Sequence, residues 1–335
     1  MTRRYILTID GGGIRGIIPL TLLVALERDT ARPVRETFSF AAGTSTGAVI
    51  AALLAAGIPA ARILDLYLNR AGEVFTQRPW GQLVRLFTGA LYSTQRLHDL
   101  IVRELGPARG WTLNDAPIDL LITATGLRDG MPWYFVRDAP VNARRTGHLR
   151  LADCATASSA APTYFQPWTV REDPATRPPG ATPIGPLVDG GVGVAGNPVY
   201  QACVEAFYYT DAGRSRPEET TVVSLGTGRY IAPERPRWLG TWLSWVLDQL
   251  LRSPGEQQTA LVQRHFSQAA LYRLDPRLPR NIGLDDLGSA SELRALGEAL
   301  AARVSWSAIL NGTDNTFRIG PHNTLWTQYS RQTPV

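Results

Sequence analysis

The chain has no lysine, so arginine supplies all 34 of its Lys-plus-Arg residues, and among 335 residues there are only two cysteines and four histidines. Two cysteines, Cys154 and Cys203, cannot build a disulfide framework, and neither lies at the spacing of a zinc site. We therefore expect both to be small buried residues. The absence of lysine beside 31 glycines and 24 prolines is typical of a genome rich in G and C.

Neither sign of charge dominates the chain. The formal net charge is +5, with 44% hydrophobic and 19% charged residues, which favours a globular protein over a disordered one. The arginines do not gather into the stripe that DNA-binding proteins carry, so we expect no nucleic acid polymer as a partner. A guanidinium can still bind two oxygens at once, which favours anionic lipids or nucleotides as ligands.

Long hydrophobic runs are also missing. The longest apolar stretches, Ile17–Leu26 and Ala48–Ile58, are shorter than the roughly 20 residues that span a bilayer. The N-terminus carries two arginines but no apolar run with a small-residue cleavage site, so we see no signal peptide. We expect a soluble, cytoplasmic protein.

Short apolar runs alternate with helical patterns along the chain. The predicted strands are Tyr5–Ile9, Phe38–Ala42, Ile118–Ala124, Trp133–Val136, Leu187–Val188 and Thr221–Leu225. The predicted helices are Pro19–Leu26, Thr46–Ala56, Pro198–Tyr209 and a helix to about Val304 that begins with the capping-box pair Ser289 and Glu292. Alternation of this kind predicts an α/β fold whose central sheet is mostly parallel, with helices on both faces.

Three segments do not fit this alternation. Pro167–Pro186 is rich in proline and arginine and is predicted to be a surface loop, while Arg70–Leu100 and Trp238–Leu251 carry aromatics and are predicted to lie over the sheet. No linker divides the chain. We therefore expect a single domain over residues 1–335, with a C-terminal helical extension from about residue 229.

A serine lies between a predicted strand and a predicted helix, in the pattern Gly43-x-Ser45-x-Gly47. Small residues on both sides permit the tight turn of a nucleophile elbow, and the following helix directs its positive end at the serine. The alternative is an ordinary strand-to-helix turn capped by Thr44 or Ser45.

The glycine loop at residues 10–16 (DGGGIRG) supports two different functions. Read as Gly-x-Gly-x-x-Gly it resembles a dinucleotide site, but the acidic residue for the ribose should end the next strand, and Glu36 lies before that strand. Alternatively, glycines without Cβ atoms direct backbone N–H groups at one point, as an oxyanion hole requires. Arg15 then holds a substrate phosphate or supports the loop; the competing interpretation is a surface ion pair.

A nucleophilic serine needs a base. The histidines are His98, His148, His265 and His322, and none lies in a glycine-rich turn after a strand. Asp189 is better placed, because an apolar strand leads into Asp189-Gly190-Gly191. A carboxylate with a pKa near 4 is a weak base, so burial would have to raise that pKa. The alternative is an Asx-turn at the strand end.

Taken together, three blocks resemble the patatin-like phospholipase family. They are residues 10–16 (DGGGIRG), 43–47 (GTSTG) and 189–191 (DGG), and residues 157–165 (ASSAAPTYF) with the Asn197-Pro198 pair add to the likeness. The resemblance implies a three-layer patatin-like fold and a phospholipase A-type hydrolase without metal or other cofactor. It implies that Ser45 is the nucleophile and Asp189 its base, and that the oxyanion hole consists of Gly11, Gly12, Gly13 and the N–H of Thr46.

The resemblance also implies a way of working. Family members cleave acyl esters of membrane lipids, and some bacterial relatives are anti-phage effectors that a cyclic nucleotide activates to degrade the cell's own membrane. We therefore expect the phospholipid surface of the inner membrane as a peripheral partner, a cyclic nucleotide as candidate activator and a homo-oligomer as candidate assembly. Trp238, Trp242 and Trp245 form an apolar stripe that faces either membrane or core, and residues 80–91 are a candidate lid or acyl pocket.

Three functional hypotheses remain open at this point. The first is a lipid acyl hydrolase, whether gated by a nucleotide or an ungated general esterase or lysophospholipase. The second is a dinucleotide-binding oxidoreductase, which leaves Ser45 without a role. The third is a binding module that keeps the fold without catalysis.

Overall fold

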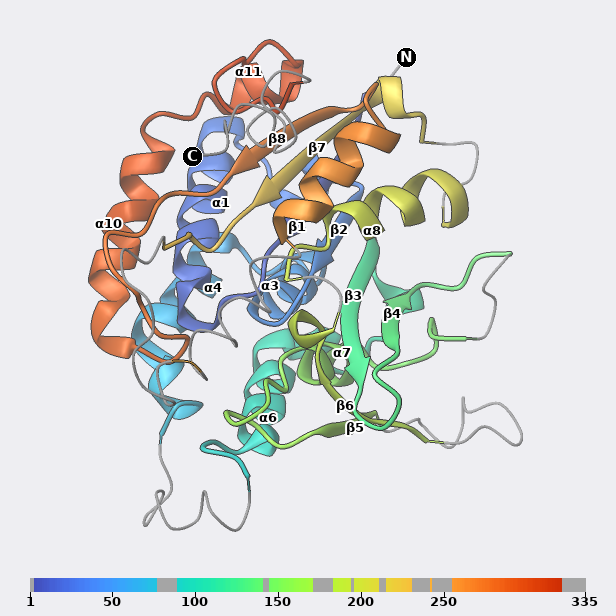
Figure 1. Cartoon of the computed structure of the whole chain (residues 1–335), viewed down its shortest axis with the longest axis vertical. Helices are drawn as coiled ribbons and strands as arrows, with labels where there is room; N and C mark the ends of the chain where they lie inside the picture. The colour runs from blue at the N-terminus through green and yellow to red at the C-terminus, as the bar shows by residue number, and fades with distance from the viewer. Residues whose placement is uncertain are drawn as a thin grey trace, which may run out of the picture.

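A twisted sheet runs through the centre of the protein in the computed structural model, which describes residues 3–76, 89–140, 145–170, 183–193, 196–210, 215–230, 242 and 255–320 (Figure 1). Eight strands belong to it in the described residues, in the order β5-β6-β3-β2-β1-β7-β8, and β4 pairs with β3 off this path. The strands are β1 (Arg4–Ile9), β2 (Phe40–Gly43), β3 (Asp119–Gly126), β4 (Pro132–Val136), β5 (Trp168–Val170), β6 (Ile184–Asp189), β7 (Thr220–Leu225) and β8 (Ala270–Leu274).

The middle of this sheet is parallel, as the alternation of strands and helices predicts. Strands β3, β2, β1, β7 and β8 pair in parallel, so their carboxyl ends meet at one edge. Such strands are covered on both faces and therefore consist of continuous apolar runs such as residues 222–225. The predicted mostly parallel α/β sheet is confirmed.

One predicted loop is wrong at both of its ends. Within Pro167–Pro186, residues 168–170 form β5 and residues from Ile184 onward belong to β6, and both strands are antiparallel to their neighbours. The side chains of Trp168 and Val170 are buried while Thr169 is exposed, so β5 alternates as an edge strand does. Proline and arginine nearby hid this short signal, and residues 171–182 lie outside the described part.

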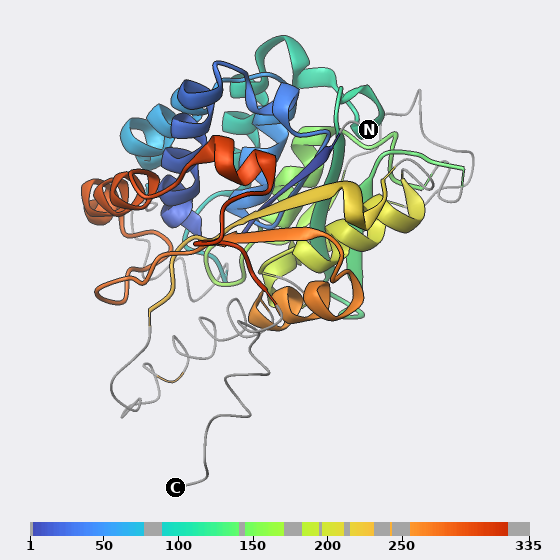
Figure 2. The ribbon, with the colours of Figure 1, turned by 90° about the horizontal axis from the view of Figure 1, so that it is seen from above.

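Helices cover both faces of the sheet, which gives three layers (Figure 2). The α-helices are α1 (Ile17–Thr30), α2 (Val34–Thr37), α3 (Thr46–Ala55), α4 (Ala60–Asp65), α6 (Thr94–Leu105), α7 (Leu151–Ser158), α8 (Val199–Val204), α10 (Ala290–Ala301) and α11 (Trp306–Asn311), with a further helix at 255–265. Alternate strand residues divide between two cores: Leu7 and Ile9 pack with α1 and α3, whereas Ile6 packs with α8 and helix 255–265. Both cysteines are buried and free.

The C-terminal part is more than the predicted helical extension. It contains α10 and α11, but β8 also joins the central sheet beside β7. The predicted capping box is wrong: the Ser289 side chain does not cap α10, since its hydroxyl bonds Asp286, and the helix ends at Ala301. Within the described ranges, no helix is long and apolar enough to cross a bilayer.

Candidate active site

Strand register brings Ser45 and Asp189 together at the carboxyl edge of the sheet. Gly43, the last residue of β2, pairs with Ile122 on β3, two residues before Ala124, and Ser45 follows in the turn after β2. Ala124 in turn pairs with Asp189 at the end of β6, on the other side of β3. The Ser45 hydroxyl lies near enough to the Asp189 carboxylate to lower its pKa, so two residues 144 positions apart share one site.

The backbone at Ser45 has the geometry of a nucleophile elbow. Its φ of 55° and ψ of −125° are unusual for a residue with a side chain, and its N–H donates to Ser158 Oγ at 2.8 Å. The turn needs glycine on both sides. A Cβ at Gly43 would lie 2.2 Å from Gly47 O, and one at Gly47 would lie 2.1 Å from Ile9 O. Helix α3 begins at Thr46, and the Ser45 side chain makes no capping hydrogen bond to it, so this is not a turn capped by Ser45.

Asp189 is held rigidly and is nearly inaccessible, with 1% of its surface exposed. Its N–H donates to Ala160 O at 3.0 Å, and one carboxylate oxygen accepts the Gly191 N–H at 2.8 Å. Burial raises the pKa of Asp189 to about 6, although hydrogen bonds from the Ser45 hydroxyl and the Gly191 N–H act to lower it. The carboxylate therefore has a pKa that suits a base at neutral pH better than the usual value near 4 would.

The glycine loop directs only part of the predicted donor set toward the serine. The Gly11 N–H donates to Gly196 O at 2.8 Å, so in this conformation it is engaged within the fold. The amides of Gly12, Gly13 and Thr46 have no acceptor in the part of the chain that the structure describes. Gly13 and Thr46 also line the cavity beside Ser45, which leaves these three amides as the candidate oxyanion donors.

Arg15 lies inside the fold, with 2% of its surface exposed. Its Nε donates to Gly12 O at 3.3 Å, and its backbone N–H donates to the same oxygen at 3.1 Å. The interpretation as a surface ion pair is therefore wrong. Of its two predicted roles, the geometry agrees with support of the glycine loop.

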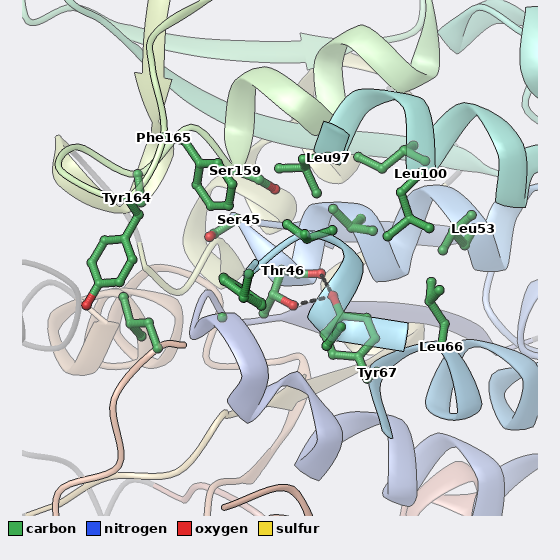
Figure 3. Close-up of a pocket in the computed structure, with 18 residues that line it drawn as sticks. Ser45, Thr46, Leu53, Leu66, Tyr67, Leu97, Leu100, Ser159, Tyr164 and Phe165 are labelled. Atoms are coloured by element: carbon green, nitrogen blue, oxygen red, sulfur yellow. Dashed lines mark hydrogen bonds between the residues drawn. The ribbon is translucent and has the colours of Figure 1, made fainter. Parts of the chain in front are cut away.

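An apolar cavity of about 780 Å3, part of it open to solvent, extends from Ser45 (Figure 3). Ser45 and Tyr164 lie at one end, and the side chains of Leu53 and Leu66 lie toward the other. The lining residues come mainly from α3, α6 and the segments at 66–75 and 161–165. A lining of mostly apolar side chains is typical of a pocket for a largely hydrocarbon ligand.

The aromatic segments that were candidates for membrane contact are mostly outside the described residues. This is true of residues 80–88 and of Trp238 and Trp245. Trp242 is described and 46% of its surface is exposed. Leu91 packs against the larger core, beside the lining of the cavity.

Two histidines that could have served as bases are engaged elsewhere. His98 stacks on the Trp168 ring at 4.9 Å between centroids, and its Nε2 lies 3.8 Å from the Asp153 carboxylate. The Nδ1 atom of His265 shares a hydrogen bond with Tyr200 Oη at 2.8 Å. His322 lies outside the described part.

Sequence reasoning missed several residues that shape the site. Asp10 receives two hydrogen bonds from Arg273, and Tyr67 shares a hydrogen bond with the Thr46 hydroxyl. Tyr67 belongs to a π-helical turn at Leu66–Arg70, which sequence periodicity does not reveal. The hydroxyl that accepts the Ser45 N–H, that of Ser158, lies in the 157–165 block and was noted only as part of the family likeness.

We expect kcat to fall on the acid side of pH 6. Asp189 must be ionised to accept a proton, so kcat for a short soluble ester should be flat from pH 7 to 8 and half-maximal near pH 6. Burial also raises the pKa of Asp10, the first residue of the glycine loop, to about 6. If protonation of either carboxylate lowers the rate, a plot of log kcat against pH should have a slope between one and two below pH 6. A plateau that persists to pH 4.5 would contradict this assignment.

The acid loss should precede unfolding. A carboxyl whose pKa is higher in the folded state binds its proton more tightly there, so titration of Asp189 stabilises the fold as pH falls from about 6 towards 4. Circular dichroism at pH 5 should therefore report folded protein while kcat has already dropped.

Comparison with known proteins identifies the family of this chain. The family model described as patatin-like phospholipase matches residues 7–203, which include Ser45 and Asp189. The chain therefore belongs to the patatin-like phospholipase family. It is a hydrolase of the phospholipase class, and the dinucleotide-binding alternative has no support.

Individual relatives come from bacteria and plants. A cGAMP-activated phospholipase of Vibrio cholerae is 28% identical over 324 residues, which cover 87% of each chain. A cGAMP-activated phospholipase of Escherichia coli is 30% identical over 61% of this chain and 56% of its own length. Patatin-like protein 2 of Arabidopsis thaliana is 33% identical over 81% of this chain and 70% of its own.

Proposed function

We propose that the protein hydrolyses fatty acyl esters of membrane phospholipids, with Ser45 as nucleophile and Asp189 as the base that activates it. The observation that carries the proposal is the proximity of the Ser45 hydroxyl to the buried Asp189 carboxylate, with Ser45 at one end of an apolar cavity. Because the cavity can take an acyl chain, the ester carbonyl would stand at Ser45 while the head group stays outside.

The chemistry proceeds through an acyl-enzyme. Ser45 Oγ attacks the ester carbonyl carbon while its proton moves to the Asp189 carboxylate, and the amides of Gly12, Gly13 and Thr46 stabilise the oxyanion. Collapse breaks the bond to the alcohol, which leaves as a lysophospholipid with the proton from Asp189. Water then attacks the acyl-enzyme and gives its proton to Asp189. The second collapse releases the fatty acid and returns the proton to Ser45.

The same proposal includes a cyclic-nucleotide activator. It is supported by the two relatives that are cGAMP-activated phospholipases, one of which aligns over 87% of both chains. On this account the protein is a single patatin-like domain, assembled as a homo-oligomer, that degrades the inner membrane from the cytoplasmic side in anti-phage defence. A surface with a net charge of +5 would favour both an anionic lipid and an anionic nucleotide.

The test is fatty-acid release from mixed phospholipid vesicles, with and without cyclic GMP–AMP and other cyclic oligonucleotides. We expect a cyclic nucleotide to raise release by about 5- to 150-fold, the usual range of an allosteric coupling, and a linear dinucleotide to have no effect. Full release without any nucleotide would contradict the gating and leave an ungated acyl hydrolase. No release under any condition, with folded protein, would contradict the hydrolase itself.

A further inference from the structure

A buried arginine outside the cavity binds the residue that begins the glycine loop. Nη1 and Nη2 of Arg273 donate to the two carboxylate oxygens of Asp10 at 2.9 and 2.6 Å. Only 14% and 13% of the two side chains are exposed. A two-bond fork of this kind fixes orientation as well as distance, because both groups are planar.

The strand register explains how Arg273 reaches Asp10. Thr8 on β1 pairs with Ser224 on β7, and Ser224 pairs with Arg273 on β8, so the three side chains form one row on one face of the sheet. Asp10 is two residues beyond Thr8 along the chain direction of β1. The guanidinium therefore crosses β7, where it also donates to Ser224 Oγ at 2.9 Å.

The same cluster holds the neighbouring turn against the glycine loop. Arg273 Nη2 also lies 3.1 Å from Asp275, whose other oxygen accepts the Gly228 N–H at 3.0 Å. Between them, Thr227 Oγ1 donates to Gly11 O at 2.7 Å. Hence the backbone that leads to the Gly12 and Gly13 amides is fixed by residues from β7, β8 and the turn that follows β7.

Stability alone is a poor explanation for such a cluster. Removing an arginine and two carboxylates from water is costly, and a buried ion pair often does no better for stability than well-packed apolar residues. What the pair does supply is a fixed position for Asp10, the first residue of the glycine loop.

We propose that Arg273 is a positioning residue, which acts through Asp10 to hold the Gly12 and Gly13 amides toward the oxyanion that forms at Ser45. The inference rests on the proposed function, since it assigns a role within that reaction. Arg273 does not line the described cavity, so it contributes little to substrate binding. Its removal should therefore slow the chemical step without weakening the binding of substrate.

The experiment measures kcat and KM for a short soluble ester in four variants. Arg273→Gln removes the charge, Arg273→Lys keeps it without the fork, and Asp10→Asn with Arg273→Gln leaves no unpaired buried charge at Asp10. The matched control is Arg294→Gln, which breaks an exposed pair with Glu298 on α10.

We expect Arg273→Gln and the double variant to lower kcat per folded molecule by about 10- to 100-fold with KM within about twofold, since removing one oxyanion donor outright costs about 100- to 1000-fold. Arg273→Lys should fall between these variants and wild type, and the control should match wild type. Circular dichroism gives the folded fraction of each variant.

Two results would overturn the proposal. In the first, Arg273→Lys and the double variant have the same kcat per folded molecule as wild type. The cluster would then have a structural role only. The other is a rise in KM with kcat unchanged. Failure of the proposed function is recognised separately, because the Ser45→Ala variant would then hydrolyse the ester as wild type does.

Discussion

Replacing Ser45 with alanine is expected to lower fatty-acid release by at least about 10⁴-fold, since loss of a catalytic serine in a comparable protease costs about 10⁶-fold in kcat. The substitution keeps the Cβ and removes only the hydroxyl, whose partner Asp189 retains the Gly191 N–H. The fold should therefore survive, with a melting temperature within a few degrees of wild type. Release from phospholipid vesicles, followed by mass spectrometry of the free fatty acids, provides the measurement.

The matched control for this substitution is Ser39→Ala. Ser39 lies just before β2, whose far end leads to the elbow, and its exposed hydroxyl makes only a long contact with Tyr5 O at 3.5 Å. It should behave as wild type. If Ser45→Ala retained more than a tenth of the wild-type rate, the nucleophile would have to be another group.

Replacing Asp189 with asparagine is expected to lower kcat by at least about 10⁴-fold, which is the cost of losing the aspartate that assists the histidine of a Ser-His-Asp triad. An asparagine Oδ1 can still accept the Gly191 N–H, so the turn after β6 should keep its shape. What it cannot do is take the proton from Ser45. Steady-state kinetics with a soluble ester and a thermal melt together separate lost chemistry from lost folding.

Asp153→Asn is the control for Asp189→Asn, because both change a buried carboxylate to an amide. Asp153 is 4% exposed and accepts the Trp168 Nε1–H at 2.9 Å, a bond that an amide oxygen can replace. It should retain kcat. A rate for Asp189→Asn within tenfold of wild type would indicate that a different base activates Ser45.

Sequence reasoning singled out Ser45 and Asp189 because both follow apolar strands and both are next to glycine turns, Ser45 between Gly43 and Gly47 and Asp189 before Gly190-Gly191. Short, mostly apolar runs such as Thr221–Leu225 are typical of central strands in a sheet that is covered on both faces. The predicted bounds of these central strands therefore lie within about two residues of the observed ones. The predicted strand also made the nucleophile elbow recognisable. The pattern Gly43-x-Ser45-x-Gly47 indicates an elbow only where a strand precedes it and a helix follows it.

What remained hidden depends on pairings between distant parts of the chain. Arg273 meets Asp10 across 263 positions, and nothing in the residues around Arg273 distinguishes it from an arginine on the surface. The N–H of Gly11, unlike those of Gly12 and Gly13, donates to a distant carbonyl, that of Gly196. No local sequence pattern can reveal this bond. Edge strand β5 has three residues, too few for its alternation to stand out in a segment rich in proline.

Covalent trapping tests the central claim most directly, namely that Ser45 is the nucleophile. The protein would be incubated with a fluorophosphonate, digested and mapped by tandem mass spectrometry, in wild type and in the Ser45→Ala and Asp189→Asn variants. We predict one adduct on Ser45 in wild type, none in Ser45→Ala and slow labelling of Ser45 in Asp189→Asn. An adduct on a different residue, with the same yield in Ser45→Ala, would contradict the account.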